Sequence, residues 1–157
     1  MKRICCLIGL VATLFLTCSC TALDNETIVG TWNMDKHSSM GMYTNEDGQT
    51  MSSYSYFEFD GKNFPDMYTH LTFNADGTGS HLTSHYDADN TLTSMETPFN
   101  WTLEDGGLYM TTSDGEPVFK TNGFKATLTG SRLYLEKIVK DDANDFKENM
   151  ILYRIVE

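Results

Sequence analysis

The chain has 157 residues, with 22 acidic against 11 basic side chains and a formal net charge of −11. A surface this acidic repels phosphate backbones and anionic lipid headgroups, which excludes nucleic acid as a partner and charge-driven attachment to membranes. The length suits one domain with a single core.

The start of the chain has the layout of a secretory signal. A short basic stretch, Met1–Arg3, is followed by an uncharged apolar run over residues 4–16 and then by the sequence TCSC. The apolar run is too short to span a bilayer, which takes about 20 residues. We therefore expect residues 1–19 to be removed as a signal peptide.

The cysteines of the chain all lie in this leader, at Cys5, Cys6, Cys18 and Cys20. We therefore expect no disulfide in the folded body. The end of the leader resembles the lipobox of bacterial lipoproteins, in which a small residue precedes a cysteine that is acylated and becomes the new N-terminus. Ser19 precedes Cys20, which makes Cys20 the first candidate for lipidation, and Cys18 is the second. A plain cleaved signal with incidental cysteines is the alternative.

The lipobox resemblance implies a location. It places the mature protein in the cell envelope of a Gram-negative-type bacterium, as a lipoprotein of the outer membrane or cell surface. Acyl chains such as palmitate would hold it there, because the acidic protein surface would not. Residues 20–26 would then be the acylated cysteine and a short tether, and residues 27–157 a single folded domain.

From Thr27 onward, runs rich in β-branched and aromatic residues alternate with tight-turn signals such as Asp76-Gly77 and Asp105-Gly106. The pattern predicts about nine strands, over 27–34, 52–59, 67–74, 78–86, 96–103, 107–112, 117–129 with a break at Asn122-Gly123, 132–138 and 148–156. No window has the 3.6-residue period of an amphipathic helix. Segments 35–51 and 139–147 carry no clear strand pattern, and we expect the first to be a flap or to contain a helical turn.

Within most of these runs, apolar side chains alternate with polar ones. Phe99, Trp101 and Leu103, for example, alternate with Asn100 and Thr102. One apolar and one polar face is typical of antiparallel strands over a core. The last run is apolar on both faces, and we expect it to be buried on both sides. The predicted fold is an all-β, antiparallel, up-and-down meander barrel of about 8–9 strands.

The sequence Gly30-Thr31-Trp32 on the first predicted strand, with Arg154 on the last, resembles the lipocalin family and its bacterial lipocalin-like relatives. In that family a tryptophan closes the floor of the barrel, and an arginine from a late strand lies across it. The resemblance implies that Gly30, Trp32 and Arg154 close one end here. The chain departs from the family pattern in having no disulfide and no expected helix before or after the barrel. An ordinary core tryptophan in another β-sandwich is the alternative.

Inward residues of an eight-stranded barrel either fill it or line a cavity for one small ligand. The candidate cavity residues are Phe57, Phe59, Leu71, Phe73, Phe99, Trp101, Met110 and Phe124. They favour the reversible binding or carriage of a small apolar or amphipathic molecule. If the same side chains fill the barrel, the protein is instead a structural or interaction module that presents loops such as 35–51 to a protein or glycan partner.

The sequence carries none of the common catalytic or cofactor motifs. It has no nucleophile elbow, no phosphate-binding loop and no dinucleotide fingerprint, so we expect neither an enzyme nor a cofactor. His37, Met40 and Met42 are candidate copper(I) ligands, because thioethers and an imidazole suit that soft ion. Methionine as a gap filler in the core is the alternative, and it is the one we favour, so no metal is expected.

Two further histidines, His81 and His85, lie four residues apart. On a strand that spacing corresponds to roughly 13 Å, too far to share a metal ion. The turn over 74–78 predicts that Leu71 lies opposite His81 and that His70 faces the other side. We expect these histidines to be partly exposed strand residues.

Overall fold

The computed structural model describes residues 23–44, 47–59, 66–119, 121–140 and 144–156. This part of the chain forms one short helix and nine strands: α1 (Asn25–Ile28), β1 (Gly30–Thr44), β2 (Thr50–Glu58), β3 (Tyr68–Phe73), β4 (Thr78–Tyr86), β5 (Leu92–Glu104), β6 (Gly107–Thr111), β7 (Phe124–Thr129), β8 (Arg132–Lys140) and β9 (Asn144–Arg154).

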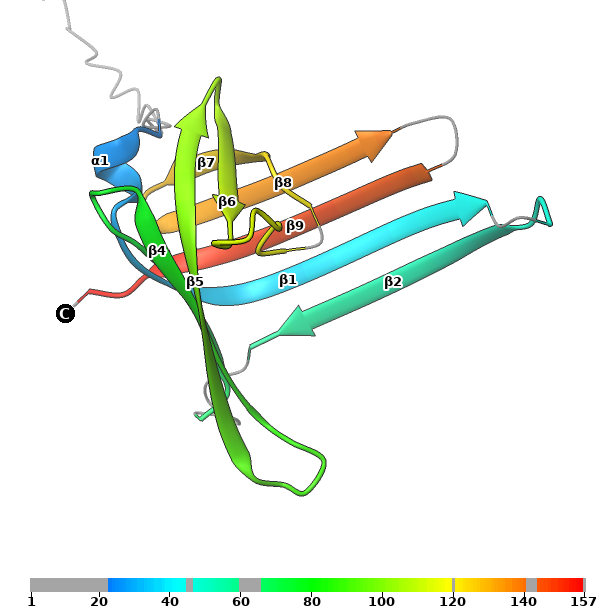
Figure 1. The fold of residues 1–157 in the computed structure, drawn as a ribbon, viewed down its shortest axis with the longest axis horizontal. Helices are drawn as coiled ribbons and strands as arrows, with labels where there is room; N and C mark the ends of the chain where they lie inside the picture. Colours follow the sequence, from blue (N-terminus) through cyan, green and yellow to red (C-terminus); the bar gives the residue numbers. More distant parts are fainter. Residues whose placement is uncertain (1–22, 45–46, 60–65, 120, 141–143, 157) are drawn as a thin grey trace, which may run out of the picture.

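The strands form one antiparallel sheet in which β3 to β9 pair in chain order and β9 pairs back with β1. This pairing closes a barrel of β1 and β3–β9, with β2 as an extra strand (Figure 1). One edge of β1 pairs with two strands in turn. Gly30–Asn33 pairs with β3, and Lys36–Thr44 pairs with β2. The predicted all-β meander barrel is confirmed.

The two ends of the barrel differ. At the helix end, α1 lies beside the start of β1 (Figure 1). At the other end, the β1–β2 hairpin extends alongside β8 and β9 (Figure 1); we call this the hairpin end. The long β4–β5 hairpin diverges from the β1–β2 hairpin in the same view.

A β-bulge in β1 decides which side chains point inward. Met34 pairs with Leu152 and Lys36 with Ile151, so Asp35 is the extra residue. Side chains alternate between the faces of a strand, so one extra residue exchanges the two faces. Before the bulge Trp32 and Met34 point inward. After it, the inward residue is His37, which lies opposite the buried Met150.

The core lies between the bulge and the helix end. It contains Ile28, Trp32, Met34, Leu71, Phe73, Phe99, Trp101, Leu108, Met110, Phe124, Leu128, Leu133, Leu135, Met150 and Leu152. These side chains come from the inward positions of the barrel strands and from α1. Their burial is the main source of stability for the fold.

Several strand predictions were wrong at their boundaries. Residues 35–44 continue β1, so segment 35–51 is largely one hairpin and not a flap or a helical turn. Segment 139–147 is partly the ends of β8 and β9. Residues 117–119 and 121, predicted as strand, lie between β6 and β7, and the described residues there keep only an isolated bridge, Thr111 to Pro117.

Two further expectations fail for reasons of local geometry. Residues 25–28 form a helix, because the Asp24 side chain accepts hydrogen bonds from the backbone N–H groups of Glu26 and Thr27 and caps it. The last strand is buried on its inward face only, since Ile151 and Tyr153 remain partly exposed. A barrel wall has one face toward the core and the other toward solvent.

Candidate functional site

The helix end is closed by Arg154, which lies opposite Trp32 in the β1–β9 ladder. Its guanidinium carbon is 4.4 Å from the centre of the indole ring. The same group donates hydrogen bonds to the carbonyl of Val29 at 2.8 Å and to that of Thr27. Trp32 Nε1 donates to the carbonyl of Ile28 at 2.8 Å. The pair therefore ties the end of α1 to the barrel.

Gly30 allows this close approach. Its φ is +132°, a conformation that residues with a Cβ rarely adopt, and a Cβ there would lie 3.0 Å from Arg154 Nη1. The three residues expected to close the barrel, Gly30, Trp32 and Arg154, are thus brought together.

The candidate cavity residues lie mostly in the packed core. Leu71, Phe73, Met110 and Phe124 are 0–1% exposed, whereas side chains that border a water-sized space would retain accessible surface. The Phe73 ring makes edge contacts with Phe99 and Trp101, at centroid distances of 5.7 and 5.6 Å. A Cβ at Gly79 would lie only 2.5 Å from the Phe99 ring. These residues fill the helix-end half of the barrel and do not line a cavity there.

The other two candidates lie apart from this group. Phe59 is partly buried and packs against the core. Phe57 is 58% exposed, on the inward-facing side of β2 beyond the core.

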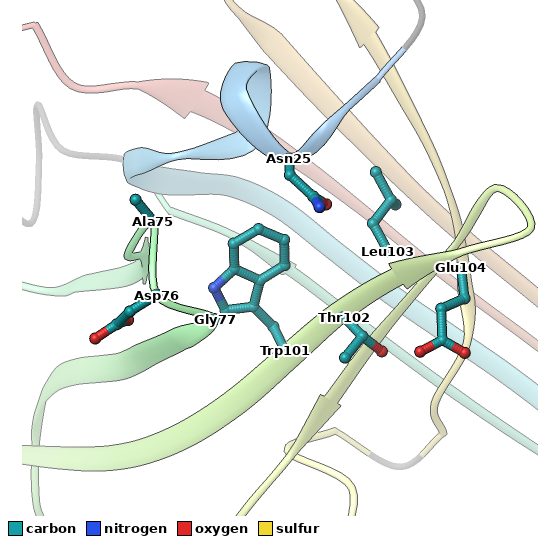
Figure 2. Close-up of a pocket in the computed structure, with 8 residues that line it drawn as sticks. All are labelled: Asn25, Ala75, Asp76, Gly77, Trp101, Thr102, Leu103 and Glu104. Atoms are coloured by element: carbon teal, nitrogen blue, oxygen red, sulfur yellow. The ribbon is translucent and has the colours of Figure 1, made fainter.

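A pocket of about 350 Å³ opens at the helix end, outside the core. Figure 2 shows the Trp101 ring between Asp76 and Leu103, with Asn25 of α1 beside them. Trp101 is 6% exposed, and its Nε1 donates to the carbonyls of Asn74 and Thr78. The indole nitrogen is thus already satisfied, and the carboxylates of Asp76 and Glu104 make the rim acidic.

A polar group lies inside the barrel at the hairpin end, where the apolar core stops. Glu148 on β9 is 0% exposed, and Lys137 and Ser39 lie opposite it on the two neighbouring strands. One carboxylate oxygen lies 2.8 Å from His37 Nε2, and the other accepts a hydrogen bond of 2.9 Å from Thr121. Both oxygens of this buried carboxylate therefore have protein partners, as its burial requires.

Phe119 joins this group to the core. Its ring centroid is 6.0 Å from that of His37, 5.1 Å from that of His81 and 6.1 Å from that of Phe124. Phe119 comes from the chain between β6 and β7. We call His37, His81, Thr121 and Glu148, with the Phe119 ring between them, the polar cluster.

His81 is the incompletely satisfied member of the polar cluster. Its Nε2 is buried and has no hydrogen-bond partner in the described part of the chain. Burial lowers the pKa of His81, and the nearby His37 lowers it further. The ring is therefore neutral at pH 7. A buried polar atom without a partner costs about 1–3 kcal/mol, which makes it a position where a ligand atom would be stabilised.

The structure separates the candidate copper ligands. His37 points inward after the bulge, whereas Met40 and Met42 lie on the opposite face of β1 and are 50% and 46% exposed. Among the described residues, no group of three or more His, Cys, Asp or Glu side chains is arranged to hold a metal ion. The expected register is found, since Leu71 lies opposite His81 and His70 faces the other side.

The lipidation candidates Cys20 and Cys18 lie outside the described residues, as does the whole of segment 1–19. Within the ranges that the structure describes, no helix has the length and apolar character needed to cross a membrane.

The sequence patterns did not predict three members of the polar cluster: Phe119, Thr121 and Glu148. A signal for Glu148 exists, because it occupies an inward position in the alternation Phe146, Glu148, Met150, Leu152 of the last strand. No comparable pattern exists for Phe119 and Thr121, which lie outside the regular strands.

Comparison with known proteins gives one family match. A family model described as a lipocalin-like domain matches residues 28–135. Barrels of this kind generally bind small hydrophobic ligands. No curated protein matches the chain.

Proposed function

Because the chain belongs to the lipocalin-like domain family, we propose that it binds a small apolar or amphipathic ligand at the hairpin end of its barrel. The observation that carries this proposal is the polar cluster, and above all the buried Nε2 of His81 without a partner. The packed core at the helix end directs the ligand to the opposite end.

The residues of this end suit an amphipathic molecule. Its apolar part would lie against Phe57 and Phe119, and its polar group would pair with His81 Nε2 after displacing the Phe119 ring from it. The acidic chain and the buried Glu148 favour neutral or cationic ligands over fatty-acid anions. The proposal includes no catalysis, no metal and no cofactor.

We further propose that the protein acts as a lipoprotein of the cell envelope, held in the outer membrane or at the cell surface of a Gram-negative-type bacterium. The leader sequence and Ser19-Cys20 support this location. A carrier in this position would have access to membrane-derived amphiphiles.

The test is titration of the purified protein with the fluorescent probe N-phenyl-1-naphthylamine, without micelles. We expect saturable binding with a micromolar Kd, equivalent to about −8 kcal/mol. His81→Phe should change the affinity several-fold, because it removes the only polar contact proposed for the ligand. His70→Phe is the matched control, since His70 is a histidine on the outer face of the neighbouring strand.

Two results would contradict the proposal. One is the absence of saturable binding to a protein that is folded by circular dichroism. The other is an equal effect of the two histidine substitutions. Mass spectrometry of lipids that co-purify with the protein would identify the natural ligand class.

The second candidate function is an interaction module that presents segment 35–51. The observation in its favour is the β1–β2 hairpin, which exposes several large apolar side chains: Met40, Met42, Tyr43, Met51, Tyr54, Tyr56 and Phe57. Met40, Met42, Tyr54 and Tyr56 share one face of the hairpin, and exposed apolar side chains gathered on one face mark interaction sites in other proteins.

A further inference from the structure

The outer edge of β2 has no partner strand among the described residues, because β2 pairs there with β1 alone, over Thr50–Glu58. Its sequence is TMSSYSYFE, and Tyr54 at its centre is 70% exposed. A free edge presents backbone N–H and C=O groups that can pair with another strand.

This edge lacks the features that usually prevent such pairing. Natural edge strands are commonly protected by charged side chains, proline or a bulge. Residues 50–57 contain no charged residue and no proline, although 21% of the chain is charged. The neighbouring residues 38–44 of β1 are also uncharged, and Glu58 at the end of β2 is paired with Lys36 at 3.1 Å. Two copies of this hairpin could therefore meet without charge repulsion between the hairpins themselves, although the rest of the chain is acidic.

The hydrogen-bond pattern shows which residues of β2 face outward along the sheet. The N–H of Phe59 donates to the carbonyl of Asp35 at 2.9 Å, so Phe59 is bonded to β1. In an antiparallel pair, bonded residues alternate with residues whose backbone groups point to the other side. The backbone groups of Ser52, Tyr54 and Tyr56 therefore point to the free edge.

The sequence around Tyr54 is nearly symmetric. Ser53 and Ser55 flank it, followed by Ser52 and Tyr56, and then by Met51 and Phe57. An antiparallel pair of two identical strands centred on Tyr54 would place Ser53 opposite Ser55 and Ser52 opposite Tyr56, and no two charged residues would face each other. Met51 would face Phe57, a sulfur–aromatic pair that is favourable in itself.

We propose that β2 pairs with β2 of a second copy of this chain, antiparallel and in register at Tyr54. The twofold axis passes between the two Tyr54 residues, which exchange backbone hydrogen bonds. Because Met40 lies opposite Tyr54 in the β1–β2 ladder, the paired hairpins carry a continuous stripe of Met40, Tyr54, Tyr54 and Met40 across one face. This inference does not rest on the proposed ligand.

The first test is disulfide formation in the full-length protein in its own membrane, under mild oxidation. In the proposed register, the Cα atoms of the two residues at position 54 lie about 5.5 Å apart, a distance that a disulfide spans. Tyr54→Cys should therefore give a covalent dimer on a non-reducing gel. Ser52→Cys is the matched control on the same face and edge. Two copies of that residue would be more than about 13 Å apart and should not react.

The register makes one more prediction about these variants. Co-expressed Ser52→Cys and Tyr56→Cys chains should form a mixed disulfide, because these positions face each other across the axis. The unmodified chain measures any background from the leader cysteines.

The second test is sedimentation of the purified full-length protein in detergent. Tyr54→Lys should shift it to the monomer, because two like charges meet at the axis. Met40→Lys adds the same charge on the neighbouring strand, away from the free edge, and should leave the dimer in place. If net charge alone decided the outcome, both variants would instead favour the dimer, because an added lysine reduces the repulsion between two acidic chains.

Three outcomes would overturn the inference. These are a monomeric wild-type protein without a Tyr54→Cys dimer, equal cross-linking at positions 52 and 54, and cross-linking of position 54 only to a different protein. The first would mean that the edge is unpaired, the second that contact is non-specific, and the third that the partner is not a second copy.

Discussion

The guanidinium of Arg154 lies over the ring of Trp32 at 4.4 Å, although the two residues are near opposite ends of the folded chain. The contact exists because the first and last strands of a closed barrel must be neighbours. Arg154 also bonds the carbonyls that end α1, so one side chain connects the helix, the first strand and the last strand.

The first prediction is that Trp32 and Arg154 are energetically coupled. Trp32→Ala should lower the free energy of unfolding by about 3–5 kcal/mol, and Arg154→Ala by less. A double-mutant cycle in urea should give a coupling of about 0.5–2 kcal/mol from the cation–π contact. Arg132 lies over Tyr153 at 4.9 Å on the exposed surface, and Arg132→Ala should have a much smaller effect. Strictly additive effects at Trp32 and Arg154 would show that the contact contributes nothing.

The second prediction concerns Trp101, which fills the core. Trp101→Phe removes the donor to the carbonyls of Asn74 and Thr78 and should lower stability by about 1–3 kcal/mol. It should leave the Kd for N-phenyl-1-naphthylamine unchanged, because the proposed ligand lies at the hairpin end. The measurements are urea denaturation and probe titration. Weaker probe binding at unchanged stability would place the ligand in the pocket beside Trp101 instead.

The third prediction is that acid destabilises the protein partly through His81. The folded protein holds the pKa of His81 below 6.5, the ordinary value, so below about pH 6.5 the unfolded chain takes up a proton there before the folded one. The contribution of His81 to stability is thus present above that pH and is lost as the pH falls. The free energy of unfolding should drop between pH 7.5 and 5.5, and His81→Gln should reduce the drop. The exposed His85, changed to Gln, is the control. An unchanged pH dependence in His81→Gln would refute this assignment.

The fourth prediction is that Cys20 carries the lipid. Cys20→Ala should move the protein from the membrane fraction to the soluble fraction, because the acidic protein surface has no affinity of its own for anionic lipids. Cys18→Ala is the control and should stay with the membrane. Release of Cys18→Ala with retention of Cys20→Ala would shift the assignment by two residues.

The sequence was sufficient for the class of fold. Alternation of apolar and polar residues, with Asp-Gly turns between them, predicted the meander, and the turn at 74–78 predicted the register of Leu71 with His81. Both signals are local, so they can be read from a single chain. The pairing of Trp32 with Arg154 came from a family resemblance, because no local pattern encodes a contact between distant residues.

What the sequence did not predict depends on geometry that spans several strands. Segment 35–51 was not predicted as a strand, so His37 was grouped with Met40 and Met42, although alternation along β1 places these on the other face. The bulge at Asp35, which turns His37 inward, has no marker in the sequence. Whether Phe99 and Trp101 fill the barrel or line a cavity depends on the distance between opposite walls. The polar cluster assembles from β1, β4, β9 and the chain before β7, and only the closed barrel brings these together.

The bulge at Asp35 makes the interior of the hairpin end depend on the pairing of β1 as much as on its composition. If Asp35 were instead paired with Ile151 in a regular strand, every later residue of β1 would change face. Lys36 would lie opposite Met150 and Ser38 opposite Glu148, both inward together with Met40, and His37 would move away from Glu148 to the outer surface. One unpaired residue therefore places a histidine, and not lysine and methionine, in the interior of this end, and deleting Asp35 would keep that arrangement in a regular strand.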